Sequence, residues 1–188
     1  MTWKGRTEVG TFTLSERSVD HPDSVRLLRG FHEEQVRRYG TADSIDLDPQ
    51  VYAPPCGFFV VGYVDGQPAG CVGGRWSDRR LKVVELKKLF LRLEIRGRGL
   101  GGVLLRRVES WAKAQGACAA ILETGVRNTA AIELFESHGF QPIASYVAGR
   151  NPAINRAFCK YFVPDRHGAE LITEPSGAPT GSAQKSAT

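Results

Sequence analysis

The stretch RGRGLGG, residues 96–102, decides the fold of this chain. An apolar run at residues 83–91 precedes it and predicts a strand, and residues 99–115 predict an amphipathic helix. A glycine-rich turn between a strand and a helix leaves backbone N–H groups free, and the helix dipole adds positive charge at the same place. Two arginines flank the glycines, so the stretch predicts a site for a phosphorylated ligand, in the first place a pyrophosphate.

Two common phosphate-binding motifs do not fit this stretch. A P-loop needs Lys-Ser or Lys-Thr after its last glycine, and neither pair follows here. A dinucleotide fingerprint opens the first unit of a doubly wound fold and has an acidic residue roughly 20 positions further on. Glu123 lies near that distance, but the stretch falls in the middle of the chain without a series of βαβ units around it.

A second motif follows the glycine-rich turn. The segment ELKKLFL (residues 85–91) precedes the turn, and NTAAIELFESHGF (residues 128–140) lies downstream of it. The first motif resembles motif A and the second resembles motif B of the GNAT superfamily, the acyl-CoA-dependent N-acetyltransferases. The motifs occur in the expected order and at ordinary spacing, and the resemblance covers about residues 11–163.

The hydrophobic periodicity predicts the order of the elements. We expect strands at 11–17, 57–64, 69–76, 83–91, 118–123, 140–146 and 157–163, and helices at about 20–40, 99–115 and 128–138. The first helix has an expected break at Gly30, and Asp65-Gly66 predicts a type I′ hairpin. A meander followed by a β-α-β-α-β run predicts a mixed α/β sheet with helices on both faces.

The resemblance makes this expectation more specific. It implies an α+β, GNAT-like fold with a mostly antiparallel central sheet of six or seven strands and about four helices. It also implies that the strands at 118–123 and 140–146 splay apart to admit the pantetheine arm of the cofactor. The expected organisation is a leader at 1–10, one acetyltransferase domain at 11–163 and a flexible, Pro-, Gly- and Ser-rich tail at 164–188.

Composition excludes several other classes. The chain has 188 residues, 41% hydrophobic and 24% charged, and no apolar run approaches the ~20 residues of a membrane span. The N-terminus lacks an apolar signal segment, and the four cysteines are scattered without metal-ligand spacing, so we expect a cytoplasmic protein with reduced thiols and no metal. The net charge of +5 is spread along the chain, which argues against nucleic acid as a partner. A homodimer is common in the superfamily, but the sequence does not decide it.

The resemblance implies that acetyl-CoA is the acetyl donor and assigns its binding residues. In the superfamily a bulge at the end of the central strand frees a backbone N–H for the thioester carbonyl, and here that strand end is residues 89–91. Phe135 stands where many members have a tyrosine that protonates the leaving thiolate, so we expect it only to pack against the pantetheine. The expected cofactor-binding residues are Leu89, Phe90, Leu91, Arg96, Gly97, Arg98, Gly99, Leu100, Gly101, Gly102, Asn128 and Phe135.

Two residues are candidates for catalysis. Glu85 lies 11 positions before Arg96, which matches the strand glutamate that serves as base in the histone-acetyltransferase branch, and burial should raise its pKa. The alternative is an ion pair with Lys87, Arg79 or Arg80. Tyr146 is the candidate acid, with Ser137 or an ordered water as alternatives, and it could equally be a half-buried strand aromatic.

The sequence therefore predicts direct acetyl transfer from acetyl-CoA to a primary amine. The loop at 41–55 contains Asp43, Asp46 and Asp48, which would attract a small cationic amine, although a solvated acidic loop explains them as well. The acceptor is either a small amine metabolite or the amine of a peptide, as in a protein lysine acetyltransferase. The missing tyrosine at Phe135 also admits an acyl-CoA-binding regulatory module with little catalysis.

Overall fold

One sheet of eight strands runs through the residues that the computed structural model describes, which are 3–7, 10–44, 47–148, 151 and 153–162. The elements are β1 (Trp3–Thr7), β2 (Gly10–Glu16), α1 (Pro22–Tyr39), β3 (Gly57–Val64), β4 (Gln67–Asp78), β5 (Val83–Leu91), a 3₁₀ turn (Leu93–Ile95), α2 (Leu100–Ala114), β6 (Ala119–Gly125), α3 (Thr129–Ser137), β7 (Gln141–Ile143) and β8 (Asn155–Tyr161). The strand order is β1-β2-β3-β4-β5-β6-β8-β7, and only β5 and β6 are parallel neighbours. The expected mixed, mostly antiparallel α/β fold is confirmed.

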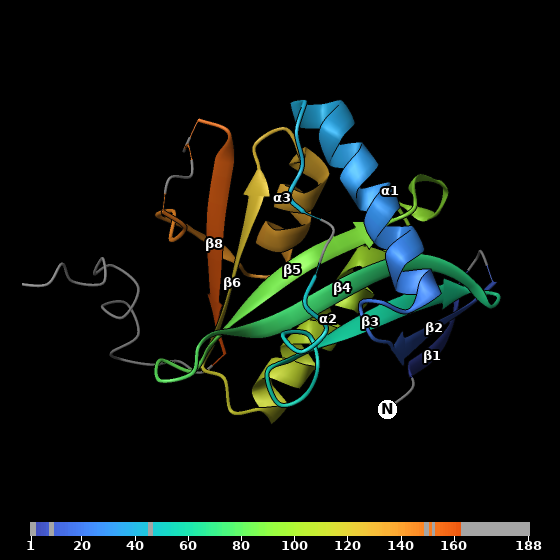
Figure 1. Cartoon of the computed structure of the whole chain (residues 1–188), viewed down its shortest axis with the longest axis horizontal. Coiled ribbons are helices and arrows are strands. Elements are labelled where there is room, and N and C mark those ends of the chain that lie inside the picture. Colours follow the sequence, from blue (N-terminus) through green and yellow to red (C-terminus); the bar gives the residue numbers. More distant parts are fainter. Residues whose placement is uncertain (1–2, 8–9, 45–46, 149–150, 152, 163–188) are drawn as a thin grey trace, which may run out of the picture.

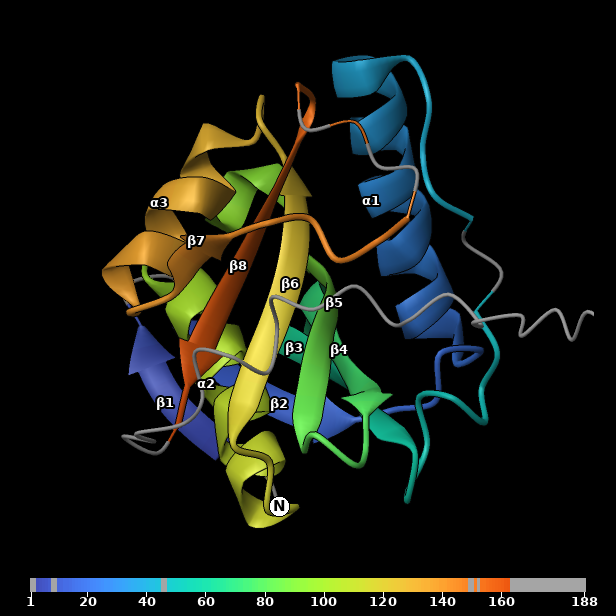
Figure 2. The same ribbon diagram turned by 90° about the vertical axis from the view of Figure 1, so that its left-hand side faces the viewer.

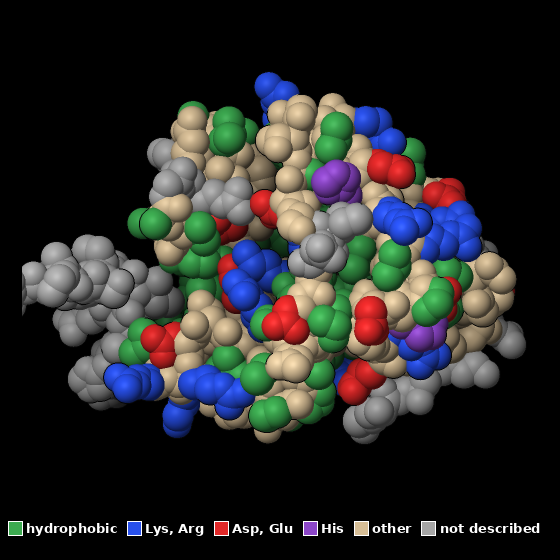
Figure 3. Space-filling view, viewed as in Figure 1, with side chains coloured by type: hydrophobic (Ala, Val, Ile, Leu, Met, Phe, Trp, Pro, Cys, Tyr) green, Lys and Arg blue, Asp and Glu red, His purple; other side chains and the backbone are tan. Residues whose placement is uncertain are grey.

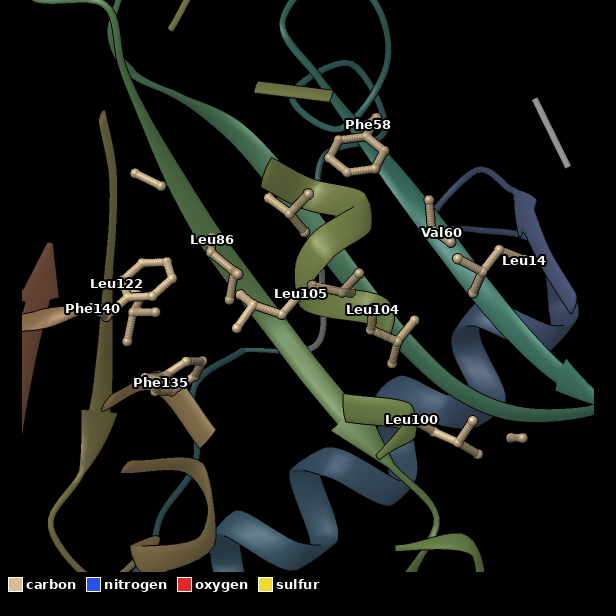
Figure 4. Packing of buried hydrophobic residues seen from close by; sticks show 14 of the residues in the cluster. Leu14, Phe58, Val60, Leu86, Leu100, Leu104, Leu105, Leu122, Phe135 and Phe140 are labelled. Atoms are coloured by element: carbon tan, nitrogen blue, oxygen red, sulfur yellow. The ribbon is translucent and has the colours of Figure 1, made fainter. Parts of the chain in front are cut away.

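The helices lie on both faces of the sheet (Figures 1 and 2). On one face α2 and α3 cover the larger core, where Leu104 and Leu105 are fully buried beside Leu86 and Leu122 of the sheet (Figure 4). On the other face Leu27 and Leu28 of α1 pack against residues of β3 and β4. Each such leucine contributes roughly 1.5–3 kcal/mol by leaving water, so both helices are fixed by their apolar stripes.

The described residues form one strand more and one helix fewer than expected. Residues 3–7, expected to belong to a loose leader, form β1, which pairs antiparallel with β2. The sequence WKGRT has no apolar alternation, and backbone pairing on a sheet edge leaves no signal in composition. The expected tail at 164–188 lies outside the described residues, so the domain boundary there stays a prediction.

Helix α1 is continuous, so the expected break at Gly30 is wrong. A Cβ at Gly30 would lie 3.3 Å from the ring of Phe90, which shows that the helix approaches β5 closely at this point. Gly30 thus allows α1 to pack closely against β5 and does not interrupt the helix. The hairpin expectation is confirmed, because Asp65 and Gly66 both have positive φ, 46° and 80°.

The sheet splits between β5 and β6, and not where the resemblance implied. These strands pair only at Val83–Ala119, Val84–Ala120 and Glu85–Ile121. Beyond Glu85, β5 continues beside β4 and β6 continues beside β8. The expected splay between 118–123 and 140–146 is wrong, because β8 lies between β6 and β7. Chain order alone does not show that the last strand inserts inside the sheet edge.

Candidate active site

A groove of about 520 Å³ runs from the start of α2 along the end of β5. Its walls come from the glycine-rich turn, α1 and α3. Ten of the twelve expected cofactor residues line it: Leu89, Phe90, Leu91, Arg96, Gly97, Gly99, Leu100, Gly101, Gly102 and Asn128. The other two differ, because Arg98 is exposed outside the groove wall and Phe135 lines the adjoining cavity.

The turn presents backbone to the groove. Gly97 and Gly99 have φ of 75° and 73°, a conformation that side chains other than glycine rarely adopt. Gly99 is the N-cap of α2 and carries no side chain to cap it, so the first N–H groups of a 15-residue helix open toward the groove. This end of the groove is suited to an anion such as a pyrophosphate.

Arg96 is held by α1. Its Nε donates to the carbonyl of Leu91 at 2.8 Å, and both Nη atoms contact the carboxylate of Glu34. Glu34 also pairs with Arg38 four residues on. Arg96 therefore adds positive charge to the groove wall while it ties the glycine-rich turn to α1.

A narrow neck of about 90 Å³ leads from the groove into the split between β5 and β6. Phe135 lines it and packs at 5.9 Å from the ring of Phe140. Asn128 lines both the groove and the neck. Although it is the N-cap of α3, its side chain makes no capping bond and instead donates to Thr124 at 3.5 Å.

A bulge lies beside the neck. In the β4–β5 ladder Cys71 pairs with Phe90 and Gly73 pairs with Lys87, so one residue of β4 faces both Lys88 and Leu89. Lys88 has a φ of 57°. Bulges re-aim backbone groups, and this one lies where β6 no longer pairs with β5. The bulge that the resemblance implied at the strand end is present.

A chamber of about 300 Å³ follows the neck on the side of α1. It is lined by Gln35, Tyr39, Thr41, Ala42, Asp43, Lys87, Glu123, Thr124, Gly125, Val126, Arg127, Ile154 and Asn155. The neck shares seven of these residues, including Lys87 and Glu123, so groove, neck and chamber form one line along the split. Figure 3 shows a hollow on this face in which acidic and basic side chains lie side by side.

Of the three aspartates expected to attract an amine, one reaches the chamber. Asp43 lines it, and its backbone carbonyl is 3.2 Å from Nδ1 of His32. Asp48 is exposed and accepts a hydrogen bond from the backbone N–H of Gln50. For Asp48 the alternative of a solvated acidic loop therefore holds. Asp46 lies outside the described residues.

Glu85 lies in a buried ion-pair network. It is 2% exposed, and its Oε2 accepts from Nε and Nη2 of Arg75 at 3.0 and 2.7 Å. Its Oε1 accepts from the Tyr146 hydroxyl at 2.8 Å and lies 2.6 Å from Nζ of Lys87. Burial pushes the pKa of Glu85 upward, but the charge of Lys87 and the hydrogen bonds from Lys87, Arg75 and Tyr146 lower it overall. The expectation of a raised pKa is therefore wrong.

Tyr146 is the hydrogen-bond partner of Glu85. Burial, the charge of Glu85 and the hydrogen bond to it raise the pKa of Tyr146 far above its ordinary value. Neither residue is among those that line the groove, the neck or the chamber. Of the network, only Lys87 reaches the cavities.

Sequence reasoning missed the polar walls of the chamber, above all Glu123 and Arg127. Glu123 lies in β6 directly after the apolar residues of that strand, and its Oε1 accepts a hydrogen bond from Ser145 at 2.6 Å. A carboxylate at the end of a buried strand is the signal that could have identified it.

The described residues contain no group of three or more His, Cys, Asp or Glu side chains that could hold a metal ion. None of the helices in the described ranges has the length and apolar character needed to cross a membrane.

The model of the acetyltransferase (GNAT) family matches residues 24–140, well over half of the chain. The IAA acetyltransferase of Azospirillum brasilense is 37% identical over 94 residues, which are 50% of this chain and 61% of that protein. The N-acetylaspartate synthetase of Rattus norvegicus is 32% identical over 99 residues, 53% of this chain and 33% of that protein. The chain thus spans less than two thirds of the length of these relatives.

Solved structures agree in fold. The PaiA N-acetyltransferase of Thermoplasma acidophilum, solved in complex with coenzyme A, has a TM-score of 0.64 at 14% identity, over 80% of this chain and 99% of that one. An acetyltransferase of Streptococcus agalactiae has a TM-score of 0.63 at 20% identity, over 80% and 98%. With the two motifs, the split sheet and the family match in agreement, the chain belongs to the acetyltransferase (GNAT) family.

Proposed function

We propose that the chain transfers an acetyl group from acetyl-CoA directly to the primary amine of a small acceptor. The observation that carries this proposal is the unbroken line of groove, neck and chamber along the split between β5 and β6. The pyrophosphate would bind at the start of α2, the pantetheine would pass the neck, and the amine would enter from the chamber.

The chemistry requires three contributions. The amine must lose a proton, the thioester carbonyl must be polarised, and the thiolate must leave. The bulge at Lys88 and Leu89 supplies re-aimed backbone beside the neck for the carbonyl. The two substrates would enter from opposite ends of this line of cavities and meet at the neck. Much of the rate enhancement would therefore come from their orientation.

We assign the base to Glu123 rather than to Glu85. Glu123 lines both the neck and the chamber, so it can reach the amine. Glu85 lines none of these three cavities and accepts bonds on both oxygens, so it would act by fixing Lys87 at the neck, with Tyr146 in the same supporting role. The catalytic roles first expected of Glu85 and Tyr146 remain predictions that variants can test.

A small acceptor is favoured over a protein lysine. The chamber is walled by the end of α1, by the 41–43 segment and by Ile154 and Asn155, and its volume of about 300 Å³ suits a small molecule. The names of the relatives refer to different compounds, so they do not choose among small acceptors. A cytoplasmic location, in keeping with the four free thiols, and a homodimer also remain proposals.

The test combines binding and turnover. Acetyl-CoA at about 100 times its Kd should stabilise the protein by roughly 2.7 kcal/mol in thermal unfolding. Release of the CoA thiol should then depend on an added amine. Stabilisation without release for any amine would favour the second candidate, an acyl-CoA-binding module, which Phe135 in place of the usual tyrosine suggests. The absence of both signals would overturn the proposal.

A further inference from the structure

The chamber carries charges of both signs. Asp43 and Glu123 contribute carboxylates, whereas Lys87 and Arg127 contribute cations. A plain amine needs only the acidic wall. The basic wall therefore calls for a separate explanation.

The positive charge of Lys87 is already neutralised by an ion pair within the protein. Its Nζ lies 2.6 Å from Oε1 of Glu85, a carboxylate kept ionised by this ion pair and by Arg75. Arg127 differs from it. Its Nη1 donates to the carbonyl of Arg38 at 2.9 Å, and no carboxylate of the described residues lies within ion-pair distance of it.

The Arg38 carbonyl fixes the Arg127 guanidinium by one edge only. The Nε–Nη2 edge keeps two parallel N–H donors, the arrangement that binds a carboxylate through both oxygens. The backbone that carries Arg127 is held on both sides, since Val126 donates to Ile154 at 3.0 Å and Asn128 donates to Gly125 at 2.9 Å. The backbone of Arg127 is therefore fixed, and its exposed side chain is tethered at the chamber wall by the Arg38 carbonyl.

Two neutral groups of the chamber also lack partners. The Tyr39 hydroxyl and Oε1 of Gln35 are buried, and neither has a hydrogen-bond partner among the described residues. A hydroxyl can donate to a carboxylate, and an amide oxygen can accept from an ammonium. Buried polar groups are normally paired, so these two point to a ligand that carries both functions.

We propose that the acceptor is a small amino acid-like molecule that carries a carboxylate beside its amine. Arg127 and Tyr39 bind the carboxylate, while Asp43, Glu123 and Gln35 receive the amine end. This inference rests on the proposed function and names the substrate class of the same site.

The experiment compares each L-amino acid with its own carboxamide as acceptor, at saturating acetyl-CoA. The two differ in the carboxylate and in the pKa of the amine, which is lower in the carboxamide, so they are compared at equal concentrations of the neutral amine. We expect kcat/KM to be about 10- to 100-fold higher for the acid, the range of a lost charge-assisted bidentate contact. The variant Arg127→Gln should remove that preference by raising KM for the acids, with the KM of acetyl-CoA unchanged.

Arg37→Gln is the matched control, because Arg37 is an exposed arginine of α1 outside the chamber wall. It should behave like the wild type. Equal turnover of acids and amides, or an equal loss for both in Arg127→Gln, would overturn the inference while the proposed function stands.

Calorimetric titration of the same acids and amides tests the carboxylate site independently of turnover. If no acceptor releases CoA, the proposed function fails. Binding of the acids alone, lost in Arg127→Gln, would still support the carboxylate site, and binding of neither class would overturn it.

Discussion

Tyr146 donates a hydrogen bond of 2.8 Å to Oε1 of Glu85, which joins the segment after β7 to the first part of β5. The two residues expected to be acid and base are therefore partners of each other. An isolated acid–base pair would face the substrate, but both lie outside the cavity walls. Their role is best tested through stability and activity together.

Replacing Glu85 by Gln should lower the free energy of unfolding at neutral pH by about 1.5–3 kcal/mol, the range for a hydrogen bond to a charged group. The pKa of Glu85 is lowered in the folded protein, so its contribution is full above the unfolded-state pKa of about 4.3 and is lost as the pH falls through the folded-state value. Urea unfolding at neutral pH and in acid measures this. A difference between wild type and variant that stays constant into acid would contradict it.

Replacing Glu123 by Gln should reduce kcat by about 10²–10⁴-fold, the usual contribution of a general base. Tyr146→Phe and Glu85→Gln should each reduce it by on the order of 10-fold or less, since they act through Lys87. Steady-state CoA release, assayed below the unfolding transition of every variant, separates these cases. If Glu85→Gln lowers kcat as much as Glu123→Gln does, and the Glu85→Gln variant still binds acetyl-CoA normally, the base is Glu85.

Replacing Gly125 by Ala should close the chamber. The added Cβ would lie 2.2 Å from the Tyr39 hydroxyl and 2.4 Å from the adjacent ring carbon, so the tyrosine must move. We expect a loss of about 1–3 kcal/mol of stability and a raised KM for the acceptor, with acetyl-CoA binding retained. The double variant with Tyr39→Ala should recover most of the stability, because the clashing group is gone. Additive losses would show that the two residues do not interact.

The two arginines of the glycine-rich turn should behave differently. Arg96→Gln breaks the contacts with Glu34 and with the Leu91 carbonyl, so both stability and acetyl-CoA affinity should fall. Arg98 is exposed, and Arg98→Gln should leave stability within about 0.5 kcal/mol of the wild type. Any loss of acetyl-CoA affinity in Arg98→Gln should disappear at high salt, as expected of a screened surface charge. Calorimetry at two salt concentrations, with thermal unfolding beside it, distinguishes the variants.

The elements could be read from the sequence because each carries a local signal. The range of β5 was predicted to the residue, since an apolar run bounded by a turn marks both of its ends. The glycine-rich turn likewise predicts the start of α2. The edge strand β1 has no such pattern, and backbone pairing alone recruits it.

The site could be predicted only in part. The groove is formed mostly by residues close together in the sequence, and the chamber is formed by residues far apart in it. Residues 89–102 form most of the groove wall within one stretch of chain. The chamber instead combines Tyr39, Lys87 and Arg127, which the fold brings together from three distant segments. The pKa of Glu85 is lowered first by Lys87, which the sequence offered as an ion-pair partner, and then by Arg75, its partner across the β4–β5 ladder, which no spacing rule identifies.

Helix α1 is a wall shared by both ends of the catalytic line. Glu34 in it holds Arg96 at the groove, and the Arg38 carbonyl, one turn later, holds Arg127 at the chamber. A movement of these last turns alters both cavities at once. By thermodynamic linkage, whatever factor acetyl-CoA imposes on acceptor affinity through this helix, the acceptor imposes in equal measure on acetyl-CoA.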